Sequence, residues 1–481
     1  MSGRGKFFLS AAVGALLLAG AAVAVIVWTR ERDRRVCVAA AIPAVPDTGA
    51  LSPEFRRRIE DCGTRARNGP DRVDALGELS RLYHANGFYS EASRCYEALI
   101  QVDPGNPRWL HRFATILAGY GQLDDALPLW RRAAEIAPDY IPTLLKQADA
   151  LLKMNRDEEA AVAYGAVLKR EARNPWALVG LARIDMDAGR FEDARGRLEA
   201  AVEESNWGIG YDLLPTVYER LGMNERVAEI RGRAKAFGTF SDTPDPWMLE
   251  LYDDCYDVYR LMLAGGDANF VGDLPRAVRI IERALSLAPD NATVHFQLAG
   301  LYLAANRRVD ARRQFEQCLA ANPEQPDAWF QLSRVLADLG DARGSDRTLD
   351  AGLSRCPGSP GLHMEHGRRL AAAGRSEEAI SEYKETIRLR PQEAGGYVDL
   401  AGLYFKLGRL DEGVAQLMRS LEMEPENPVA LSAAALYSVT TGDEATAAEW
   451  IRRVRLQPRI SAKERTNIEA AFVQRFGRPP Q

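Results

Sequence analysis

The sequence predicts an all-α protein, a right-handed α-solenoid of about eleven 34-residue helical hairpins in two sub-arrays, preceded by one transmembrane helix. Three observations lead to this fold class. A self-similarity with a period of 34 residues runs through most of the 481-residue chain, as in proteins built from stacked repeats. Within each period, apolar residues recur at helical spacing. Before the repeats lies a run without charged residues that is long enough to cross a bilayer.

The N-terminus predicts a membrane anchor. Residues 1–6 form a basic leader, and residues 7–28 carry no charge over 22 positions, which is enough to span a hydrocarbon core of about 30 Å. The charged run Arg30–Arg35 follows at once, in place of the small residues of a cleavage site, and this favours an uncleaved signal anchor over a cleaved signal peptide. We expect a charged, Pro-rich, semi-extended spacer over residues 29–52 and a capping helix over residues 53–72.

Charge does not decide on which side of the membrane the repeats lie, because basic residues flank the apolar run at both ends. A short basic leader before an apolar core is typical of export signals and favours a periplasmic or extracytoplasmic repeat domain. The four arginines after the core favour the cytoplasm. We expect the extracytoplasmic side, with the cytoplasm as the alternative.

The strongest evidence for repeats is the fifteenth position of each 34-residue register, counted from Val73 and again from Val258. It holds glycine or asparagine, which tolerate the left-handed backbone conformation that ends a helix before a tight turn. These residues are Gly87, Gly121, Asn155, Gly189, Gly272, Asn306, Gly340, Gly374, Gly408 and Gly442. Position 20 is small in every register, where the two helices of a hairpin approach closely. The small residues are Ala92, Ala126, Ala160, Ala194, Ala277, Ala311, Ser345, Ala379, Gly413 and Ala447.

One register resembles the signature of the tetratricopeptide repeat. The matching positions are Trp329, Leu332, Ser333, Leu336, Gly340, Ser345, Leu349 and Pro357, with departures from the family pattern at Ser333 and Ser345. The resemblance extends over about residues 73–460. It implies helical hairpins that each bury an apolar face against the next one, and a groove lined by first-helix residues that binds proteins or peptides.

The phase of the repeats is broken once, which predicts two arrays. The expected segments are a first array over 73–241 with a degenerate fifth repeat, an insertion over 242–257, a second array over 258–460 and a C-terminal capping helix over 461–481. Ser461 and Glu464 form a capping box at the start of the last helix. The insertion combines aromatic and acidic residues. Its Trp247 either contacts a partner or a second copy, or packs between the broken repeats.

The resemblance implies that particular first-helix positions contact the ligand. In the first array these positions form a basic lining with few acids, which includes Arg108, Arg112 and Lys146 and suits an acidic segment; solvated basic side chains explain it equally well. In the second array the fifth position is apolar in four successive repeats, with a polar residue after it. This apolar ladder, suited to an extended peptide or a helix, consists of Phe296, Phe330, Met364 and Val398, with Gln297 and Gln331 beside the first two. Alternatively, these side chains fill gaps between neighbouring first helices.

Composition and motifs exclude several kinds of site. The net charge of −5 argues against nucleic acid as a partner, and the sequence has no Walker loop, nucleophile elbow, zinc-protease motif or dinucleotide fingerprint. We therefore expect no enzyme activity, no cofactor and no metal. His363 and His366 lie three residues apart, but at core positions and without a further ligand. The six cysteines form no C-x-x-C pair, although Cys37 and Cys62 are a pair to test for a disulfide in an oxidising compartment.

The expected function is that of a membrane-anchored bacterial scaffold. It would mediate protein-protein interactions in assembly, secretion or maturation of cell-envelope or redox proteins, with homo-oligomers left open. The arginine bias of the chain, with only eight lysines among 62 basic residues, is typical of GC-rich bacterial genomes. The alternative is an envelope polysaccharide-recognising module of a glycan export or synthesis complex, although Phe296 and Phe330 lack the polar rim that sugars require.

Overall fold

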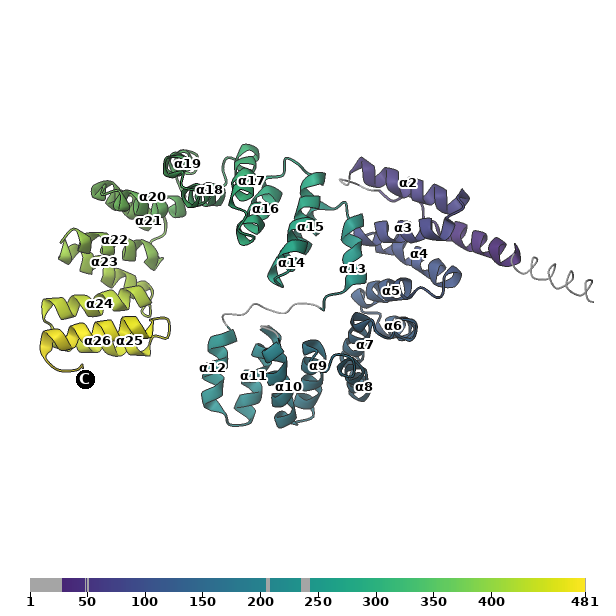
Figure 1. Cartoon of the computed structure of the whole chain (residues 1–481), viewed down its shortest axis with the longest axis horizontal. Helices are drawn as coiled ribbons and strands as arrows, with labels where there is room; N and C mark the ends of the chain where they lie inside the picture. Colours follow the sequence, from purple (N-terminus) through teal and green to yellow (C-terminus); the bar gives the residue numbers. More distant parts are fainter. Residues whose placement is uncertain (1–27, 48, 50–51, 205–207, 235–242, 481) are drawn as a thin grey trace, which may run out of the picture. The chain divides into compact units, whose positions relative to one another are not determined.

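The structure is a computed structural model that describes residues 28–47, 49, 52–204, 208–234 and 243–480 (Figure 1). All regular elements in these residues are helices. The chain forms two compact units, residues 1–289 and 290–481, and each is described by itself. The predicted anchor over residues 7–28 lies outside the described residues except for Trp28. Within the described residues, no helix has both the length and the apolar character needed to cross a membrane.

Residues 28–41 form a helix, where we expected the first half of a semi-extended spacer over residues 29–52. That expectation was wrong for these residues. The first proline after the charged run is at position 43, so nothing before it breaks a helix, and Arg35 pairs with Glu31 one turn earlier at 3.4 Å. Val38 and Ala41 are buried against the core of the first repeats. The segment therefore packs on the array and does not hold it at a distance.

The first unit begins its repeats with α2 (Pro53–Asn68), which packs on the first hairpin within the predicted capping segment 53–72. Five hairpins form the first array: α3 (Arg72–Ala85) with α4 (Tyr89–Val102), α5 (Pro107–Gly119) with α6 (Leu123–Ile136), α7 (Ile141–Lys153) with α8 (Asp157–Leu168), α9 (Pro175–Asp187) with α10 (Phe191–Glu204), and α11 (Gly208–Arg220) with α12 (Asn224–Ala234). The insertion contains α13 (Pro246–Leu249) and the 3-10 helix η1 (Glu250–Asp254), and the hairpin α14 (Val258–Phe270) with α15 (Leu274–Leu287) follows.

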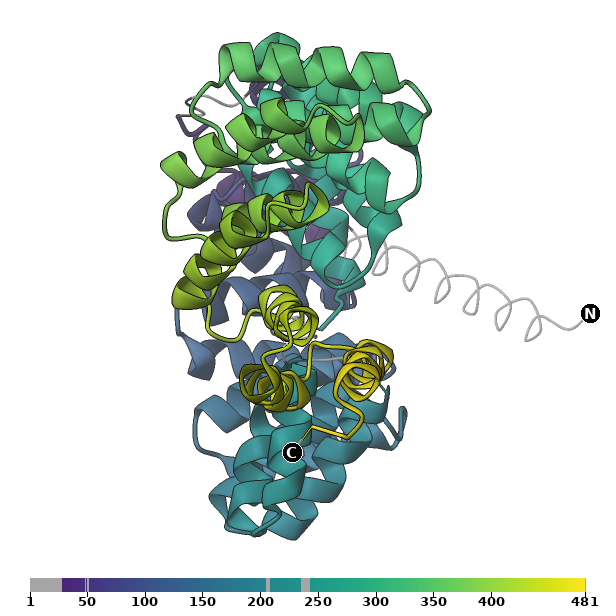
Figure 2. The same cartoon turned by 90° about the vertical axis from the view of Figure 1, so that its left-hand side faces the viewer.

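The second unit consists of five more hairpins and a closing helix, which Figures 1 and 2 show from two sides. These are α16 (Ala292–Ala304) with α17 (Arg308–Ala321), α18 (Pro326–Asp338) with α19 (Ala342–Arg355), α20 (Pro360–Ala372) with α21 (Ser376–Leu389), α22 (Ala394–Lys406) with α23 (Leu410–Met423), α24 (Pro428–Thr441) with α25 (Glu444–Leu456), and α26 (Ala462–Phe476). The Ser461 hydroxyl accepts the backbone N–H of Glu464 at 3.2 Å, as the capping box predicts. Ile468 and Phe472 close the core of the last hairpin.

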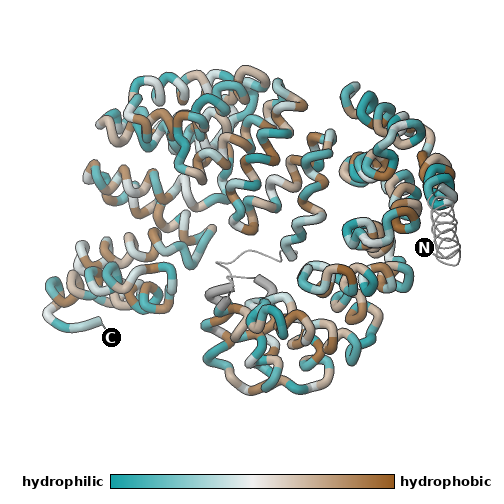
Figure 3. Tube along the Cα trace, turned by 45° about the vertical axis from the view of Figure 1, so that its right-hand side comes forward, coloured by the Kyte–Doolittle hydropathy of each residue, from teal (hydrophilic) through white to brown (hydrophobic). Residues whose placement is uncertain are grey.

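The turn inside each hairpin has the predicted backbone conformation. All ten glycine and asparagine residues at position 15 have a positive φ, from 55° at Asn155 to 84° at Gly87. The ten small residues at position 20 are all buried between the two helices of their hairpins. Apolar and polar residues alternate along the helices in Figure 3, and the apolar ones form the cores between successive hairpins.

The boundary between the two units differs from the predicted boundary between the arrays. The hairpin α14–α15, predicted as the start of the second array, belongs to the first unit. Arg260 on α14 donates a hydrogen bond to the Tyr89 hydroxyl at 3.0 Å, and Arg283 on α15 donates to the backbone carbonyl of Cys255 at 3.0 Å. The insertion thus ties this hairpin to the first repeats.

The two cysteines considered for a disulfide are free thiols. The Cys37 thiol faces the side-chain oxygen of Gln101 at 3.5 Å, whereas Cys62 is buried under the first hairpin. Burial, together with the neighbouring Glu78 carboxylate, raises the pKa of the Cys62 thiol to about 12. At neutral pH this thiol is protonated and therefore a poor nucleophile.

Candidate binding surfaces

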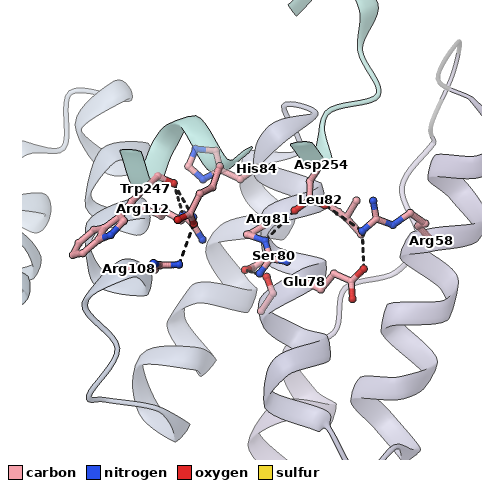
Figure 4. Close-up of polar contacts among 12 residues, drawn as sticks. Arg58, Glu78, Ser80, Arg81, Leu82, His84, Arg108, Arg112, Trp247 and Asp254 are labelled. Atoms are coloured by element: carbon pink, nitrogen blue, oxygen red, sulfur yellow. Dashed lines mark hydrogen bonds and ion pairs between the residues drawn. The ribbon is translucent and has the colours of Figure 1, made fainter. Parts of the chain in front are cut away.

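The insertion lies across the first helices of the first array. We call the surface formed by α3, α5 and α7, which carries Arg81, Arg108, Arg112 and Lys146, the basic face. Helix α13 packs on α5, and η1 packs on α3 (Figure 4). The acidic residues of the insertion meet the basic residues that were predicted to bind a ligand. Much of the basic face is therefore covered by a segment of the same chain.

Asp245 anchors the start of the insertion through a buried polar network. Its carboxylate accepts hydrogen bonds from His111 Nε2 at 2.7 Å and from the Tyr140 hydroxyl at 2.6 Å. The other ring nitrogen of His111 shares a hydrogen bond with the Thr143 hydroxyl at 2.7 Å. Burial would raise the pKa of Asp245, but the hydrogen bonds from His111 and Tyr140 outweigh it and lower that pKa. The carboxylate is thus held ionised inside the protein.

The Arg112 side chain binds the middle of the insertion, where it contacts both a backbone carbonyl and a carboxylate side chain. The Arg112 side chain is 1% exposed and donates to the carbonyl oxygen of Trp247 at 2.7 Å and to the Glu250 carboxylate at 2.7 Å. Arg108, at the edge of the same surface, pairs with Glu250 at 3.2 Å. A buried guanidinium needs such acceptors, because a buried charge without partners is costly. The insertion supplies them.

Trp247 packs on the array. Its indole ring stacks on the ring of Tyr140 with centroids 3.5 Å apart and planes 8° from parallel, and it meets His111 edge to face. The backbone N–H of Trp247 donates to the Tyr140 hydroxyl at 2.8 Å. Of the two interpretations of Trp247, the packing role is the one that these contacts describe, although the residue is only half-buried.

The end of the insertion is held by charges and by an asparagine. The Asp254 carboxylate pairs with Arg81 at 2.9 Å and with Arg58 of α2 at 3.1 Å. Asn86, at the end of α3, donates to the Asp254 carbonyl at 2.9 Å and accepts from the Tyr256 N–H at 2.6 Å. Both ends of the insertion are therefore fastened to the first three repeats.

The predicted apolar ladder is only partly packed. Phe296, Phe330, Met364 and Val398 are each half-buried, and Gln297 and Gln331 are half-buried beside the first two. The ring of Phe296 contacts Phe315 of its own hairpin edge to face, and Phe330 lies under the guanidinium of Arg334. Both interpretations of these residues describe part of what is seen, since the side chains fill gaps and also keep an accessible apolar surface. We call these four apolar residues the apolar row.

The histidine pair of the second unit lies around one carboxylate. His363 and His366 contact the two oxygens of Glu382 at 2.6 Å and 3.2 Å. His363 also contacts the backbone carbonyl of Pro357 at 3.0 Å. Among the described residues, no group of three or more histidine, cysteine or acidic side chains could hold a metal ion.

Comparison with known proteins identifies the repeat. Profiles described as "Tetratricopeptide repeat" match residues 78–141, 143–172, 158–206, 271–317, 301–360 and 370–437, which together make up more than half of the chain. The chain belongs to the tetratricopeptide-repeat family. As a tetratricopeptide-repeat protein, it is an all-α helical repeat solenoid and a scaffold for protein-protein interaction.

The chain is also similar to longer bacterial proteins. It is 24% identical to cellulose synthase operon protein C of Pseudomonas fluorescens over 457 residues. This match covers 84% of this chain and 35% of that protein. The same-named protein of Xanthomonas axonopodis is 24% identical over 375 residues, covering 76% of this chain and 21% of that one. The chain thus spans about a third or less of the length of these relatives. Among solved structures, yeast Tom70 is 14% identical, covers 85% of this chain and 97% of that chain, and has a TM-score of 0.39.

Several residues that hold the insertion were not predicted as site residues. They are Asn86, Tyr140, Thr143 and Asp245. Tyr140 lies in the turn before α7, outside the first-helix positions that the repeat pattern singles out. One signal in the sequence could have indicated these contacts. The lining of the first array is basic and the insertion is acidic, so the two segments have opposite charge.

Proposed function

We propose that this tetratricopeptide-repeat protein is a membrane-anchored scaffold of the bacterial cell envelope whose second array binds a segment of a partner protein. The partner would take part in assembly, secretion or maturation of envelope or redox proteins. The observation that supports this is the apolar row, which offers one half-exposed apolar side chain per repeat, with glutamines beside the first two. Such a row suits an extended or helical segment that carries apolar residues at regular spacing.

The contrast with the basic face supports the choice of the second array. On the basic face, Arg81, Arg108 and Arg112 already bind carboxylates of the insertion. A partner at that position would first have to displace a tethered segment, whose effective concentration is high. The apolar row is partly accessible as it stands.

Site-specific crosslinking in cells tests this proposal. A photo-crosslinking amino acid at Phe330 should trap a defined partner, whereas the same amino acid at Val309, an apolar residue of α17 that is 62% exposed, should not. The variant Phe296→Ser should reduce the yield of the Phe330 adduct, since it removes the neighbouring member of the row. Equal adducts from both positions, or none from Phe330, would contradict a binding site at the apolar row.

The predicted anchor and its orientation belong to the proposal and have their own test. We propose that residues 7–28 remain attached as a signal anchor and that the repeats lie on the periplasmic or extracytoplasmic side. Alkaline phosphatase fused to the C-terminus should be active, since it folds only outside the cytoplasm, and the chain should sediment with membranes. An active β-galactosidase fusion would place the repeats in the cytoplasm.

A second candidate function is a part in a polysaccharide synthesis or export complex. The observation that favours it is the similarity, over most of this chain, to relatives named cellulose synthase operon protein C. A protein partner and a sugar ligand can be separated by experiment. If the protein binds cello-oligosaccharides and Phe330→Ser abolishes this binding, direct sugar recognition is favoured. Absence of binding to any sugar on a glycan array would contradict direct sugar recognition.

We also propose that the chain acts without catalysis of its own, because its recognisable features are those of a binding scaffold. Turnover of a substrate by the purified full chain would contradict this.

A further inference from the structure

The helix over residues 28–41 joins the uncharged run of the N-terminus to the first repeats. Its second half packs on the array, since Val38 and Ala41 are buried in the core of the first hairpin. Val38 follows Trp28, the last residue of the uncharged run, by ten positions, which is about 15 Å along a helix. With residues 7–28 as the anchor, the first hairpin therefore begins close to the membrane surface.

The first half of this helix carries arginines that have no acidic partner in the protein. Glu31 pairs with Arg35 at 3.4 Å. Arg30, Arg32 and Arg34 are exposed and form no ion pair with any residue that the structure describes. A single further acid lies among them in the sequence, so the cations of this half outnumber its acids. An anionic group that binds these arginines has no existing ion pair to break.

The position of Trp28 relates these arginines to the depth of a bilayer. Trp28 is 63% exposed, and the Arg32 guanidinium lies over its ring, 5.9 Å from the centroid. Tryptophan is enriched where the hydrocarbon core meets the lipid headgroups, and the headgroup layer on each side is about 5–8 Å thick. Arg30 and Arg32 lie about 3 Å and 6 Å along the helix from Trp28, and Arg34 lies about 9 Å from it. The long arginine side chains can therefore all reach the level of the lipid phosphates.

We propose that Arg30, Arg32 and Arg34 bind the phosphate groups of anionic phospholipids and seat the first hairpin directly on the membrane surface. A guanidinium group matches the geometry of phosphate oxygens and binds them through paired hydrogen bonds. Because the same helix packs on the first repeats, contact with lipid also holds those repeats near the bilayer. A lipid surface fits these arginines better than an acidic protein, since the uncharged run that ends at Trp28 would bring them to the headgroups in every molecule.

This inference rests on the proposed anchor, and flotation of the full chain tests the anchor separately. The protein should float with liposomes of phosphatidylcholine alone at high salt, because an inserted apolar segment holds it there without charge attraction. Failure to float would contradict the anchor and, with it, the lipid contact of the arginines. Flotation at high salt followed by failure of the next experiment would overturn the lipid contact alone.

Crosslinking to lipid tests the arginines. A photo-crosslinking amino acid at Asp33, an exposed residue between them, is placed in the full chain in nanodiscs that contain equal amounts of phosphatidylglycerol and phosphatidylcholine. Mass spectrometry should show phospholipid adducts, with phosphatidylglycerol in about threefold or greater excess, because arginines near a bilayer attract anionic lipids. The variant Arg30→Gln/Arg32→Gln/Arg34→Gln should still float but should form the two adducts in nearly equal amounts.

Two matched controls come from the second unit. Arg313→Gln/Arg343→Gln/Arg347→Gln removes three exposed arginines that also lack ion pairs within the described ranges, and it should leave the phosphatidylglycerol excess unchanged. The photo-crosslinking amino acid at Asp411, an exposed acid of α23, should give no lipid adduct. The proposal is overturned if the Asp33 position gives no phospholipid adduct, or gives one without preference for phosphatidylglycerol. Equal loss of preference in the two triple variants, equal adducts from Asp33 and Asp411, or an adduct that joins two copies of the chain in place of lipid would overturn it as well.

Discussion

The basic face and the apolar row both lie on the first helices of tetratricopeptide repeats, but their side chains find contacts in different ways. On the basic face, buried charges such as Arg112 have their partners supplied by the insertion. In the apolar row, the side chains are half-buried by their own hairpins and their neighbours. The repeat fixes where a first-helix side chain lies, and the residue type decides whether the chain itself must supply a partner. A buried charge requires one, whereas an apolar side chain can remain half-exposed.

We expect the largest effect from replacing Asp245, which anchors the insertion on the basic face. Asp245→Ala leaves the buried His111 and the half-buried Tyr140 without their acceptor, and we expect it to lower the free energy of unfolding of the first unit by about 3 kcal/mol. Hydrogen exchange with mass spectrometry on the full chain should show faster exchange in α5 and α7, with α20 and α22 of the second unit unchanged.

The insertion offers a matched control for that variant. Asp253 is an exposed acid in η1 of the same segment, and Asp253→Ala should change the free energy of unfolding by less than about 0.5 kcal/mol. If α5 and α7 exchange no faster in Asp245→Ala than in Asp253→Ala, the contacts of the insertion do not stabilise the first array. The two surfaces would then differ in residue type but not in their need for a covering segment.

A smaller difference between the arrays should appear on acidification. His84 lies buried in α3, and burial, followed by the nearby charge of Arg112, lowers its pKa to about 3. Below about pH 6.5 the unfolded chain binds a proton that the folded chain does not, so stability falls as the pH falls. From pH 6.5 to about pH 5 we expect a loss of about 2 kcal/mol in the first unit.

Urea unfolding followed by exchange in α3 at several pH values measures this loss. His84→Gln removes the titrating group, so the slope of stability against pH in the first unit should decrease in this variant by up to about 1.4 kcal/mol per pH unit. An unaltered slope would show that another group causes the acid sensitivity.

The smallest effects are expected from the glycine turns inside the hairpins, and they should be equal in the two arrays because both arrays use the same left-handed turn. Gly121 and Gly340 have φ values of 78° and 83°, and an added Cβ would meet nothing within 4 Å at either position. Gly121→Ala and Gly340→Ala should each cost about 1–2 kcal/mol from the left-handed backbone alone. Calorimetry of the two variants should give equal losses within error. Unequal losses would show that the turns of the two arrays are not equivalent.

The sequence predicts most of this fold and part of the site, for a physical reason. Position 15 must adopt a left-handed conformation and position 20 must be small, so both leave a periodic trace in residue type that all ten registers show. The contacts of the insertion leave no such trace, because each occurs once and joins residues far apart in the chain. Arg108, Arg112 and Trp247 were selected individually, but nothing in the repeat pattern indicates that they meet.

The helix over residues 28–41 was not predicted, because residues 29–52 were treated as one charged and Pro-rich segment. The prolines begin only at position 43, and the residues before them are free to form a helix. Apolar side chains such as Val38 then find the first repeats as a partner surface, which composition alone does not show.

The insertion also affects the order in which the chain can fold. Repeat arrays usually fold through contacts between neighbouring repeats. Here, hydrogen bonds join α2 and the first repeats to residues 105 to 202 positions later. During synthesis at roughly 5–20 residues per second, α7 emerges several seconds before Asp245 does. In that interval Arg112 and His111 lack their final partners, so we expect the first three repeats to remain incompletely ordered until the ribosome has delivered the segment that completes them.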